Sequence, residues 1–296
     1  MSKSERGQIV TRKGNRLLVQ PIDGGKWVRC AQRKKLPALA IGDHVGWEST
    51  SKGEGVITAL ESRDSLLTRP DPFNQRNKPI AANIDQILVV TASEPGIDPL
   101  QVDRILVAAA ANEISALLVI NKVDLLDDEA KTLLEQQLAH YQQLPLPLLW
   151  TSTTEAHGLD RLREQLQGHS SVLVGPSGAG KSSIIQALLP DEEITVGALS
   201  EGIGQGKHTT SASTLYALPD GGTLIDSPGI REFGLWHLDE ETIRNGFMEF
   251  DNYRGECRFS NCRHLSEPGC AVNAAVESGE ISAARFENYQ LLISER

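Results

Sequence analysis

The chain has 296 residues, of which 40% are hydrophobic and 23% charged, a composition typical of folded globular proteins and not of disordered or fibrous ones. Its longest apolar stretch, residues 105–111, is far too short to span a membrane, and residues 1–6 lack the apolar core of a signal peptide. We therefore expect a cytoplasmic protein with no membrane partner, long enough for about two domains. Taken alone, the net charge of −10 argues against a nucleic-acid partner.

The charge is unevenly distributed along the chain. Residues 1–80 contain 15 Lys and Arg against 8 Asp and Glu (+7), and residues 81–296 contain 14 against 31 (−17), which sum to −10. Such asymmetry favours a basic module that contacts a polyanion, joined to an acidic body. Charge alone does not distinguish this from an ordinary solvated surface.

Five short strands are predicted near the N-terminus, over residues 8–11, 16–20, 26–31, 44–47 and 55–60. They suit a small Greek-key barrel such as an OB-fold, whose face and loops often bind oligonucleotides. A β-domain without a ligand is the alternative. The candidate RNA-binding residues are the basic ones on these strands and turns: Arg12, Lys13, Arg16, Arg29, Arg33, Lys34 and Lys35.

The polar, proline-containing segment from Thr68 to Pro79 predicts a linker. After it strands and helices alternate, which predicts a mostly parallel sheet with helices on both faces. The predicted strands cover residues 84–91, 115–120, 146–150 and 172–174, and the predicted helices cover 99–111, 125–144, 158–167 and 182–189. Residues 214–218 and 223–225 flank Pro-Asp-Gly-Gly and predict an antiparallel hairpin at one edge.

A phosphate-binding loop is predicted between the strand at 172–174 and the following helix, where the sequence fits G-x-x-x-x-G-K-[ST]. Its backbone N–H groups and the helix N-terminus would surround a phosphate. Lys181 would place its charge on the β- and γ-phosphates, and Ser182 would coordinate Mg²⁺. The predicted binding residues are Gly175, Pro176, Ser177, Gly178, Ala179, Gly180, Lys181, Ser182 and Ser183.

Residues for the γ-phosphate and Mg²⁺ follow the loop. The strand at 223–225 leads into Asp226-Ser-Pro-Gly229, where the carboxylate would hold Mg²⁺ through water and the glycine would approach the γ-phosphate. Thr209 or Thr210, after a glycine-punctuated run, would complete the Mg²⁺ coordination; the sequence does not distinguish them.

The base is predicted to be guanine. Asn121-Lys122-Val123-Asp124 follows an apolar strand, and an Asp carboxylate accepts hydrogen bonds from guanine N1–H and N2–H₂, donors that adenine lacks. Asn121 would hold the loop, and the Lys122 stem would cover the base. Thr151 and Ser152 follow the next strand and would back the guanine carbonyl.

The order of these motifs is unusual, because in most GTPases the phosphate loop precedes N-K-x-D, whereas here it follows. Parallel strands joined by crossovers can be permuted in this way when the chain ends lie close together. Over essentially its whole length the chain resembles the circularly permuted, ribosome small subunit-dependent GTPase A family of bacteria. The similarity includes the basic N-terminal strands, K-P-I-A-A-N-I-D-Q at 78–86, N-K-V-D, G-P-S-G-A-G-K-S-S, G-K-H-T-T-S, D-S-P-G and a Cys/His cluster.

The resemblance implies three domains: an OB-fold barrel (1–68), a central α/β P-loop GTPase domain with circularly permuted motif order (69–236), and a small α-helical zinc-binding domain (237–296). It also implies a GTPase that binds the small ribosomal subunit and its rRNA in late maturation, acts with other assembly factors, and hydrolyses GTP slowly without the subunit. We expect a monomer. Because Asp226–Gly229 leads directly into the C-terminal region, we hypothesise that residues 230–239 transmit the GTP state.

The position after D-S-P-G, where many GTPases have a Gln that orients the attacking water, is Ile230, so intrinsic hydrolysis should be slow. His208, beside the threonines, is the local candidate for a catalytic group that positions water. A loop histidine without a catalytic role is an equal alternative.

Three of the four cysteines and a histidine cluster near the C-terminus: Cys257, Cys262, His264 and Cys270. Three thiolates and an imidazole complete a tetrahedral structural zinc site, and the match to the family supports zinc over disulfides. Helices are expected over 239–250 and 281–293. Cys30 is expected to be a buried apolar residue.

Two functions of other classes remain open at this point. One is a nucleotide-regulated RNA-binding module, such as an RNA chaperone or translation factor, in which hydrolysis is incidental. The other is a small-molecule kinase, against which N-K-V-D argues.

Overall fold

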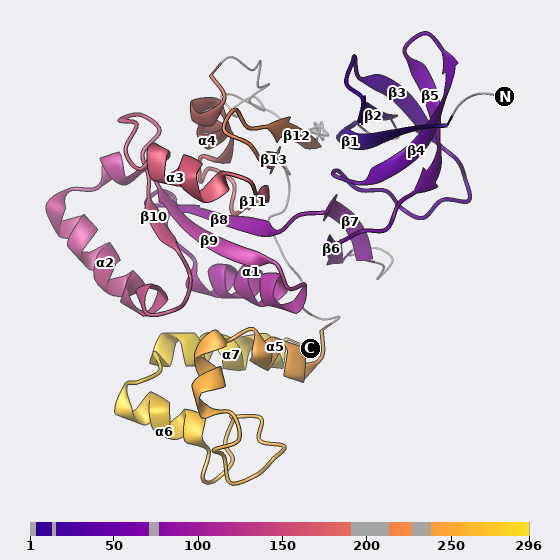
Figure 1. Ribbon diagram of the computed structural model, residues 1–296. Coiled ribbons are helices and arrows are strands. Elements are labelled where there is room, and N and C mark those ends of the chain that lie inside the picture. Colours follow the sequence, from indigo (N-terminus) through magenta and orange to yellow (C-terminus); the bar gives the residue numbers. More distant parts are fainter. Residues whose placement is uncertain are drawn as a thin grey trace, which may run out of the picture.

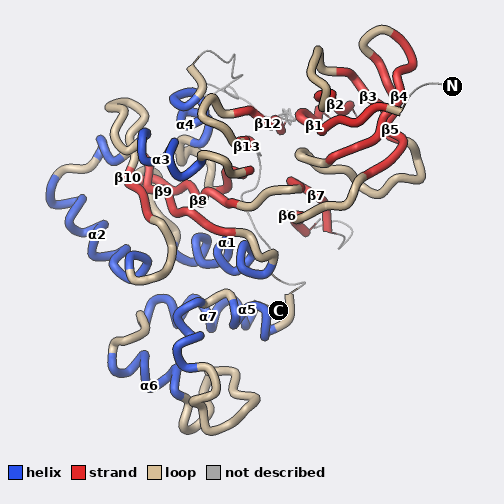
Figure 2. The backbone as a smooth tube through the Cα atoms, in the orientation of Figure 1, coloured by secondary structure: helices blue, strands red, loops and turns tan. Residues whose placement is uncertain are grey.

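A computed structural model describes residues 4–13, 16–70, 77–190, 213–226, 235 and 238–295 of the chain. Its elements form a barrel, an α/β layer and a small helical unit in chain order (Figures 1 and 2). No helix in these ranges combines the length and the apolarity needed to cross a bilayer.

The N-terminal strands close into a barrel. They are β1 (Glu5–Lys13), β2 (Arg16–Pro21), β3 (Val28–Gln32), β4 (His44–Ser51) and β5 (Glu54–Leu60), hydrogen-bonded in the order β1-β2-β3-β5-β4. Pairing of β1 with β4 closes the circle, and β3 runs parallel to β5. Alternate apolar residues fill the interior, among them Ile9, Val19, Val45 and Ile57. The five-stranded barrel predicted from the sequence is confirmed.

The segment after the barrel differs from the prediction of a linker. Strands β6 (Leu66–Pro70) and β7 (Asn77–Ala82) form an antiparallel pair, with a register shift between Leu67 and Thr68. The linker was predicted from the polar, proline-rich middle of this segment. Its apolar ends were not considered, and these ends form the strands, since Leu67 and Ala81 are fully buried. Prolines are tolerated because a two-stranded sheet consists only of edge strands.

The α/β layer contains six of the strands: β8 (Gln86–Ala92), β9 (Ser115–Asn121), β10 (Leu148–Trp150), β11 (Ser170–Val174), β12 (Ser213–Ala217) and β13 (Thr223–Asp226). Their order is β10-β9-β8-β11-β13-β12, and every strand is parallel to its neighbours except β12, which forms the predicted hairpin with β13. The α/β layer and its edge hairpin are therefore as predicted.

Helices cover both faces of this sheet. Helices α1 (Pro99–Ala111) and α2 (Asp128–Gln142) pack on one face, where Ile87, Val89 and Leu118 belong to the same core as Leu106 and Leu138. Helices α3 (Leu159–Leu166) and α4 (Lys181–Leu188) pack on the other face in a separate core. The strands are apolar on both sides because both faces are covered.

The C-terminal unit contains α5 (Glu240–Asn245), a 3-10 helix (Met248–Tyr253), α6 (Ala271–Ser278) and α7 (Ala283–Ser294). The single helix expected over 239–250 is wrong, because α5 ends at Gly246. A Cβ atom on Gly246, the residue that caps α5, would lie 2.8 Å from Val107 Cα of α1, so a side chain at this position would collide with that helix. Helix α6 was not predicted from the sequence.

A buried ionic network joins this unit to the α/β layer. Arg285 of α7 pairs with Asp103 of α1, and both side chains are almost completely buried. Arg285 also donates to both carboxylate oxygens of Glu249, at 2.7 and 2.8 Å. Tyr141 and Asn288 donate to Asp103 at 2.7 and 2.6 Å. Every charged group of the network thus has a partner, and the network connects α7 to α1.

The barrel is joined to the same layer by backbone pairing. Strand β1 lies antiparallel to β12, with Thr11 opposite Thr214 and Arg12 opposite Ser213. One sheet of 11 strands therefore runs from β10 through the α/β layer into the barrel.

Candidate nucleotide-binding site and metal centre

The predicted nucleotide-binding motifs meet at one edge of the α/β sheet. Asn121 ends β9, Thr151 follows β10, the Gly175 loop follows β11, and Asp226 ends β13. All four strands are parallel, so these residues lie at the carboxyl ends, where open α/β sheets bind their ligands.

The loop from Gly175 to Ser182 has the backbone of a phosphate-binding loop. Gly175 has a φ of +150°, and a Cβ atom there would lie 1.9 Å from the carbonyl oxygen of Val90, so glycine is required. Lys181 begins α4 and donates from Nζ to the carbonyl oxygens of Gly175 and Pro176, at 2.8 and 2.7 Å. The lysine thus folds back over the loop and places its charge where a phosphate would bind.

The base-recognition and phosphate-binding segments are hydrogen-bonded to each other. Asn121 donates from Nδ2 to the carbonyl oxygen of Ala179 at 3.0 Å and accepts from Thr151 Oγ1 at 3.1 Å. Asn121 and Thr151 are buried. A Cβ atom on Gly180 would lie 2.3 Å from Asn121 Nδ2, so this contact also explains a glycine in the loop.

The remaining base-recognition residues surround this contact. Val123 and Asp124 lie in a 3-10 turn (Val123–Leu125), and Val123 N–H donates to the carbonyl oxygen of Thr151 at 3.2 Å. Ser152 is buried, and its hydroxyl accepts from the backbone N–H of Glu155 at 3.1 Å. The side chain of Ser152 therefore stabilises the turn over residues 152–155. The side chain of Asp124 is partly exposed.

Two residues that the sequence did not indicate also hold the base-recognition loop. Ser93 Oγ donates to the carbonyl oxygen of Lys122 at 2.7 Å, and Lys122 Nζ donates to the carbonyl oxygen of Glu94 at 3.0 Å. Both belong to the loop between β8 and α1. No motif marks this loop; only its place after a parallel strand could have suggested it.

The Mg²⁺ residues are described only in part. Asp226 lies opposite Leu173, two residues before the phosphate loop. Burial raises the pKa of Asp226, and the nearby Lys181 ammonium lowers it by less. A divalent cation would offset this cost of burial, so Asp226 fits the prediction of an Mg²⁺ ligand. Ser182 is the second residue of α4, next to Lys181. His208, Thr209, Thr210 and Gly229 lie outside the described residues, as do most of residues 230–239.

The Cys/His cluster has the geometry of a tetrahedral metal site. The ligand atoms of Cys257, Cys262, His264 and Cys270 all lie within 4.8 Å of one another. Cys257 Sγ is 3.9 Å from Cys270 Sγ, and His264 Nδ1 is 3.6 and 3.3 Å from these two sulfurs. Zn–S bonds of about 2.3 Å in a tetrahedron place sulfurs about 3.8 Å apart, so the cluster fits one zinc ion.

The alternatives for the cysteines are resolved by the same geometry. No disulfide joins any of the four cysteines, and the 3.9 Å between Cys257 Sγ and Cys270 Sγ is far longer than an S–S bond of about 2.05 Å. Cys30 is buried inside the barrel, and burial raises the pKa of its thiol to about 11. Cys30 is thus the apolar core residue expected from the sequence.

The predicted RNA-binding residues differ in availability. Arg12 donates to the carbonyl oxygen of Leu39 at 2.8 Å, and Arg33 lies 3.6 Å from a carboxylate oxygen of Glu48. Lys13 ends β1. The exposed members are Arg16, Arg29, Arg33, Lys34 and Lys35.

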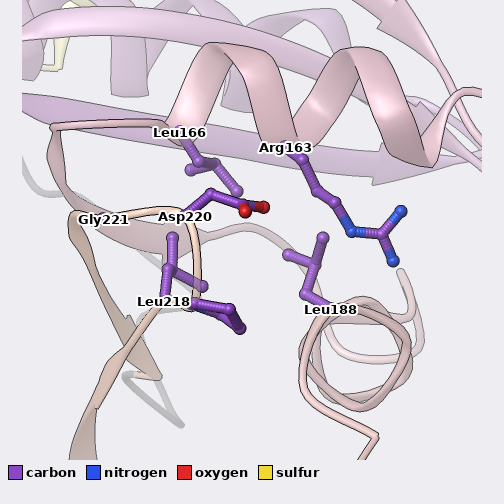
Figure 3. A pocket seen from close by; sticks show the side chains of 7 residues that line it. Arg163, Leu166, Leu188, Leu218, Asp220 and Gly221 are labelled. Atoms are coloured by element: carbon purple, nitrogen blue, oxygen red, sulfur yellow. The ribbon is translucent and has the colours of Figure 1, made fainter.

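A separate pocket lies away from all these motifs, between α3, α4 and the turn that joins β12 to β13. Leu166, Leu188 and Leu218 line it together with Arg163 and Asp220 (Figure 3). Its cavity volume of about 30 Å³ is far below the roughly 300–1,000 Å³ of typical ligand pockets, so it cannot hold a nucleotide.

The sheet order and the motifs at its carboxyl edge define a GTPase, and the position of N-K-V-D before the phosphate loop defines a circularly permuted one. Residues 60–236 match the family model described as RsgA GTPase. The chain therefore belongs to the RsgA GTPase family and is a GTP-hydrolysing enzyme. The resemblance and the fold class predicted from the sequence are confirmed.

Relatives and solved structures agree over nearly the whole chain. A Hahella chejuensis protein named small ribosomal subunit biogenesis GTPase RsgA is 48% identical over 98% of this chain and 84% of its own length. A Chromohalobacter salexigens protein of the same name is 50% identical over 90% of this chain and 77% of its own. The crystal structure of YjeQ from Thermotoga maritima gives a TM-score of 0.77 at 31% identity, covering 99% and 98% of the two chains. That of YloQ, titled a circularly permuted GTPase, gives 0.74 at 25% identity, covering 99% and 95%.

Proposed function

We propose that this GTPase acts in the biogenesis of the small ribosomal subunit, binding the subunit and its rRNA and hydrolysing GTP faster when bound to it. The names of the relatives support the subunit as the partner. The observation that carries the enzymatic part is the Asn121–Ala179 hydrogen bond, because it joins the guanine-recognition segment to the phosphate loop. A nucleotide would be held by both segments at once.

In this proposal, different residues of the carboxyl edge bind different parts of the nucleotide. Asp124 accepts from guanine N1–H and N2–H₂, while Lys181 and the loop N–H groups bind the phosphates. Mg²⁺, when bound, neutralises charge that develops between the β- and γ-phosphates. Ser182 and Asp226 would hold it, together with Thr209 or Thr210, and Gly229 would approach the γ-phosphate.

Water positioning is the step for which the chain lacks the usual residue, since Ile230 follows D-S-P-G. We propose that His208 supplies this function on the subunit. His208→Ala should lower the subunit-stimulated turnover and leave GDP affinity intact. A variant with unchanged stimulated turnover would exclude a catalytic role.

The zinc ion in this proposal is structural. Three cysteines and a histidine complete its tetrahedron, so no coordination position remains for a substrate. The ion would fold the loop between the 3-10 helix and α6. Within the chain it thereby supports a unit that is docked on α1.

We further propose that the basic barrel contacts rRNA and that the enzyme works as a cytoplasmic monomer together with other assembly factors. The net charge of +7 in residues 1–80 supports the RNA contact. The acidic remainder of the chain favours contact through the barrel rather than through the GTPase domain.

The decisive experiment measures GTP turnover of the intact chain alone and with purified small subunits, large subunits or free rRNA. We expect many-fold stimulation by small subunits only. Subunit binding without any stimulation would instead indicate an RNA-binding module in which hydrolysis is incidental.

A further inference from the structure

The barrel exposes a tryptophan. Trp27 immediately precedes β3 and has 46% of its surface exposed, although large aromatic side chains are usually mostly buried. Ile22, on the same β2–β3 loop, is 51% exposed. Neither residue contributes to the barrel core, so their exposure is not explained by folding.

Trp27 lies at the start of the strand whose outer face OB-folds use for ligands. Cys30 is buried in the barrel, so alternation along β3 directs Arg29 outward, and Trp27 is exposed directly before the strand. Strand β3 is paired with β2 through Val19 and Val28, the residue next to Trp27. The outer face of strands 2 and 3 is the surface on which OB-folds bind oligonucleotides.

The loop that carries Trp27 is held in shape by hydrogen bonds. Ile22 N–H donates to the carbonyl oxygen of Arg6 at 3.1 Å, and Gly24 N–H donates to that of Pro21 at 3.1 Å. The Gln20 side-chain amide donates to the carbonyl oxygen of Gly25 at 3.2 Å. A preorganised loop lowers the entropy that a binding partner must remove.

Two cations neighbour Trp27 in the sequence. Lys26 and Arg29 are exposed, and within the described part of the chain no carboxylate pairs with either. Arg6, by contrast, is held by Glu61 through two hydrogen bonds of 2.7 and 2.6 Å. The charges beside Trp27 are therefore available to a polyanion.

We propose that Trp27 stacks on an unpaired base of RNA while Lys26 and Arg29 bind the adjoining phosphates. The inference rests on the proposed RNA contact of the barrel and names its central residue. An exposed aromatic side chain with two unpaired cations within two residues of it fits single-stranded nucleic acid, because stacking accepts any base and the cations can bind the backbone.

The exposed aromatic of the C-terminal unit differs in this respect. Phe259 is 42% exposed, but the Arg258 guanidinium lies 5.5 Å from its ring centroid. One face of that ring is already occupied by a cation of the same chain. Trp27 has no such cover within the described residues.

The test separates an aromatic face from apolar bulk. Trp27→Leu keeps apolar bulk and removes the π face, whereas Trp27→Phe keeps a face. Affinity of the full-length chain for a 12-nucleotide single-stranded oligouridylate and for small subunits would be measured at fixed salt. Stacking is worth about 1–3 kcal/mol per base, so we expect Trp27→Leu to lose about 5- to 150-fold and Trp27→Phe to lose about twofold.

Two controls complete the design. Leu133→Ala removes a side chain that is 60% exposed on α2, outside the basic region, and should leave RNA affinity unchanged. GDP affinity should be the same in all variants, which shows that they are folded. Oligonucleotide should quench the wild-type tryptophan fluorescence and leave that of Trp27→Phe unquenched.

Equal oligonucleotide affinity of Trp27→Leu, Trp27→Phe and the wild type would overturn the proposal. So would a loss of subunit affinity in Trp27→Leu with unchanged oligonucleotide affinity, because that pattern means a protein contact. Failure of the proposed function has a different signature: small subunits would not stimulate the wild-type GTPase, whatever the variants do.

Discussion

Replacement of Gly180 by Ala should weaken nucleotide binding for a reason that the geometry specifies. Gly180 has a φ of +87°, in the left-handed region, and its added Cβ would lie 2.3 Å from Asn121 Nδ2. The amide cannot move aside easily, because it is buried and bonded at both ends, to Ala179 and to Thr151. The substitution therefore breaks the link between base and phosphate recognition.

The magnitude has two parts. A left-handed alanine costs about 1–2 kcal/mol relative to glycine, and a buried amide without its partner costs about 1–3 kcal/mol. Gly178→Ala supplies a matched comparison, since Gly178 has a φ of +84° and its nearest neighbour, Pro95 Cδ, is 3.8 Å from the added Cβ. Gly178→Ala should lose only the first part. The difference between the variants, about 1–3 kcal/mol, belongs to the Asn121 contact.

The assay must measure both the free energy of unfolding and the affinity for nucleotide. If the loop of a variant relaxes in the free protein, the strain no longer lowers its stability and appears instead as weaker nucleotide binding. For each variant the loss of unfolding free energy in urea is added to the loss of binding free energy for a fluorescent GDP analogue. This sum measures the free energy of the bound state relative to the unfolded state, and the difference between the sums of the two variants cancels the unfolded-state effect that both alanines share. Gly168→Ala, with a φ of +77° and open space around it, is the off-site control. Equal sums for Gly180→Ala and Gly178→Ala would refute the reasoning.

Three further predictions concern the ionic network, the metal site and pH. Arg285→Met leaves buried Asp103 without its cation and should lower the unfolding free energy by about 3–5 kcal/mol. Arg104→Met leaves Glu295, which is 45% exposed and can be solvated, and should cost at most about 1 kcal/mol in the same urea titration; equal losses would contradict this. Chelation of zinc should lower the helix signal in far-ultraviolet circular dichroism, and added zinc should restore it. An unchanged signal on chelation would mean that the cluster holds no ion. Burial raises the pKa of Asp226 above its ordinary 3.8, so on acidification Asp226 should become protonated, and lose Mg²⁺, at a higher pH than an exposed aspartate would. The Mg²⁺-dependent affinity for GDP should therefore decrease from that higher pH downward, and Asp226→Asn should not show this decrease. Without metal the sign reverses: the stabilising effect of protonated Asp226 is complete below pH 3.8 and is lost as pH rises through the raised pKa.

The arrangement of the candidate nucleotide site could be expected from sequence because its described parts, N-K-V-D, the phosphate loop and Asp226, are contiguous runs or single residues after apolar strands. N-K-V-D and the phosphate loop carry their own backbone requirements, and parallel strands bring their carboxyl ends to one edge. The barrel strands could also be predicted from sequence, since alternation of apolar residues and turn residues are local signals. The β6–β7 pair was not, because its polar middle outweighs the two apolar positions at its ends.

What the sequence could not indicate are contacts between residues far apart in the chain. Arg285 and Asp103 are separated by 182 positions, and a buried arginine in a helix is indistinguishable by pattern from an exposed one. Ser93 and Glu94 contribute a hydroxyl and a backbone carbonyl oxygen to the loop of Lys122, which carry no residue signature. The pairing of β1 with β12 likewise depends on the placement of one domain against another.

The pairing of β1 with β12 connects the barrel mechanically to the nucleotide site of the permuted GTPase domain. Asp226 of β13 lies opposite Thr214 of β12, and Thr214 lies opposite Thr11 of β1, so the proposed Mg²⁺ ligand and the barrel wall are two strand spacings apart, about 10 Å. The C-terminal unit is attached elsewhere, by Arg285 to α1. The two outer units are thus fixed to different elements of one GTPase fold (Figure 1). We therefore expect any nucleotide-dependent shift of β12 relative to α1 to change the spacing between the barrel and the C-terminal unit, and a polyanion that contacts both would respond to the bound nucleotide.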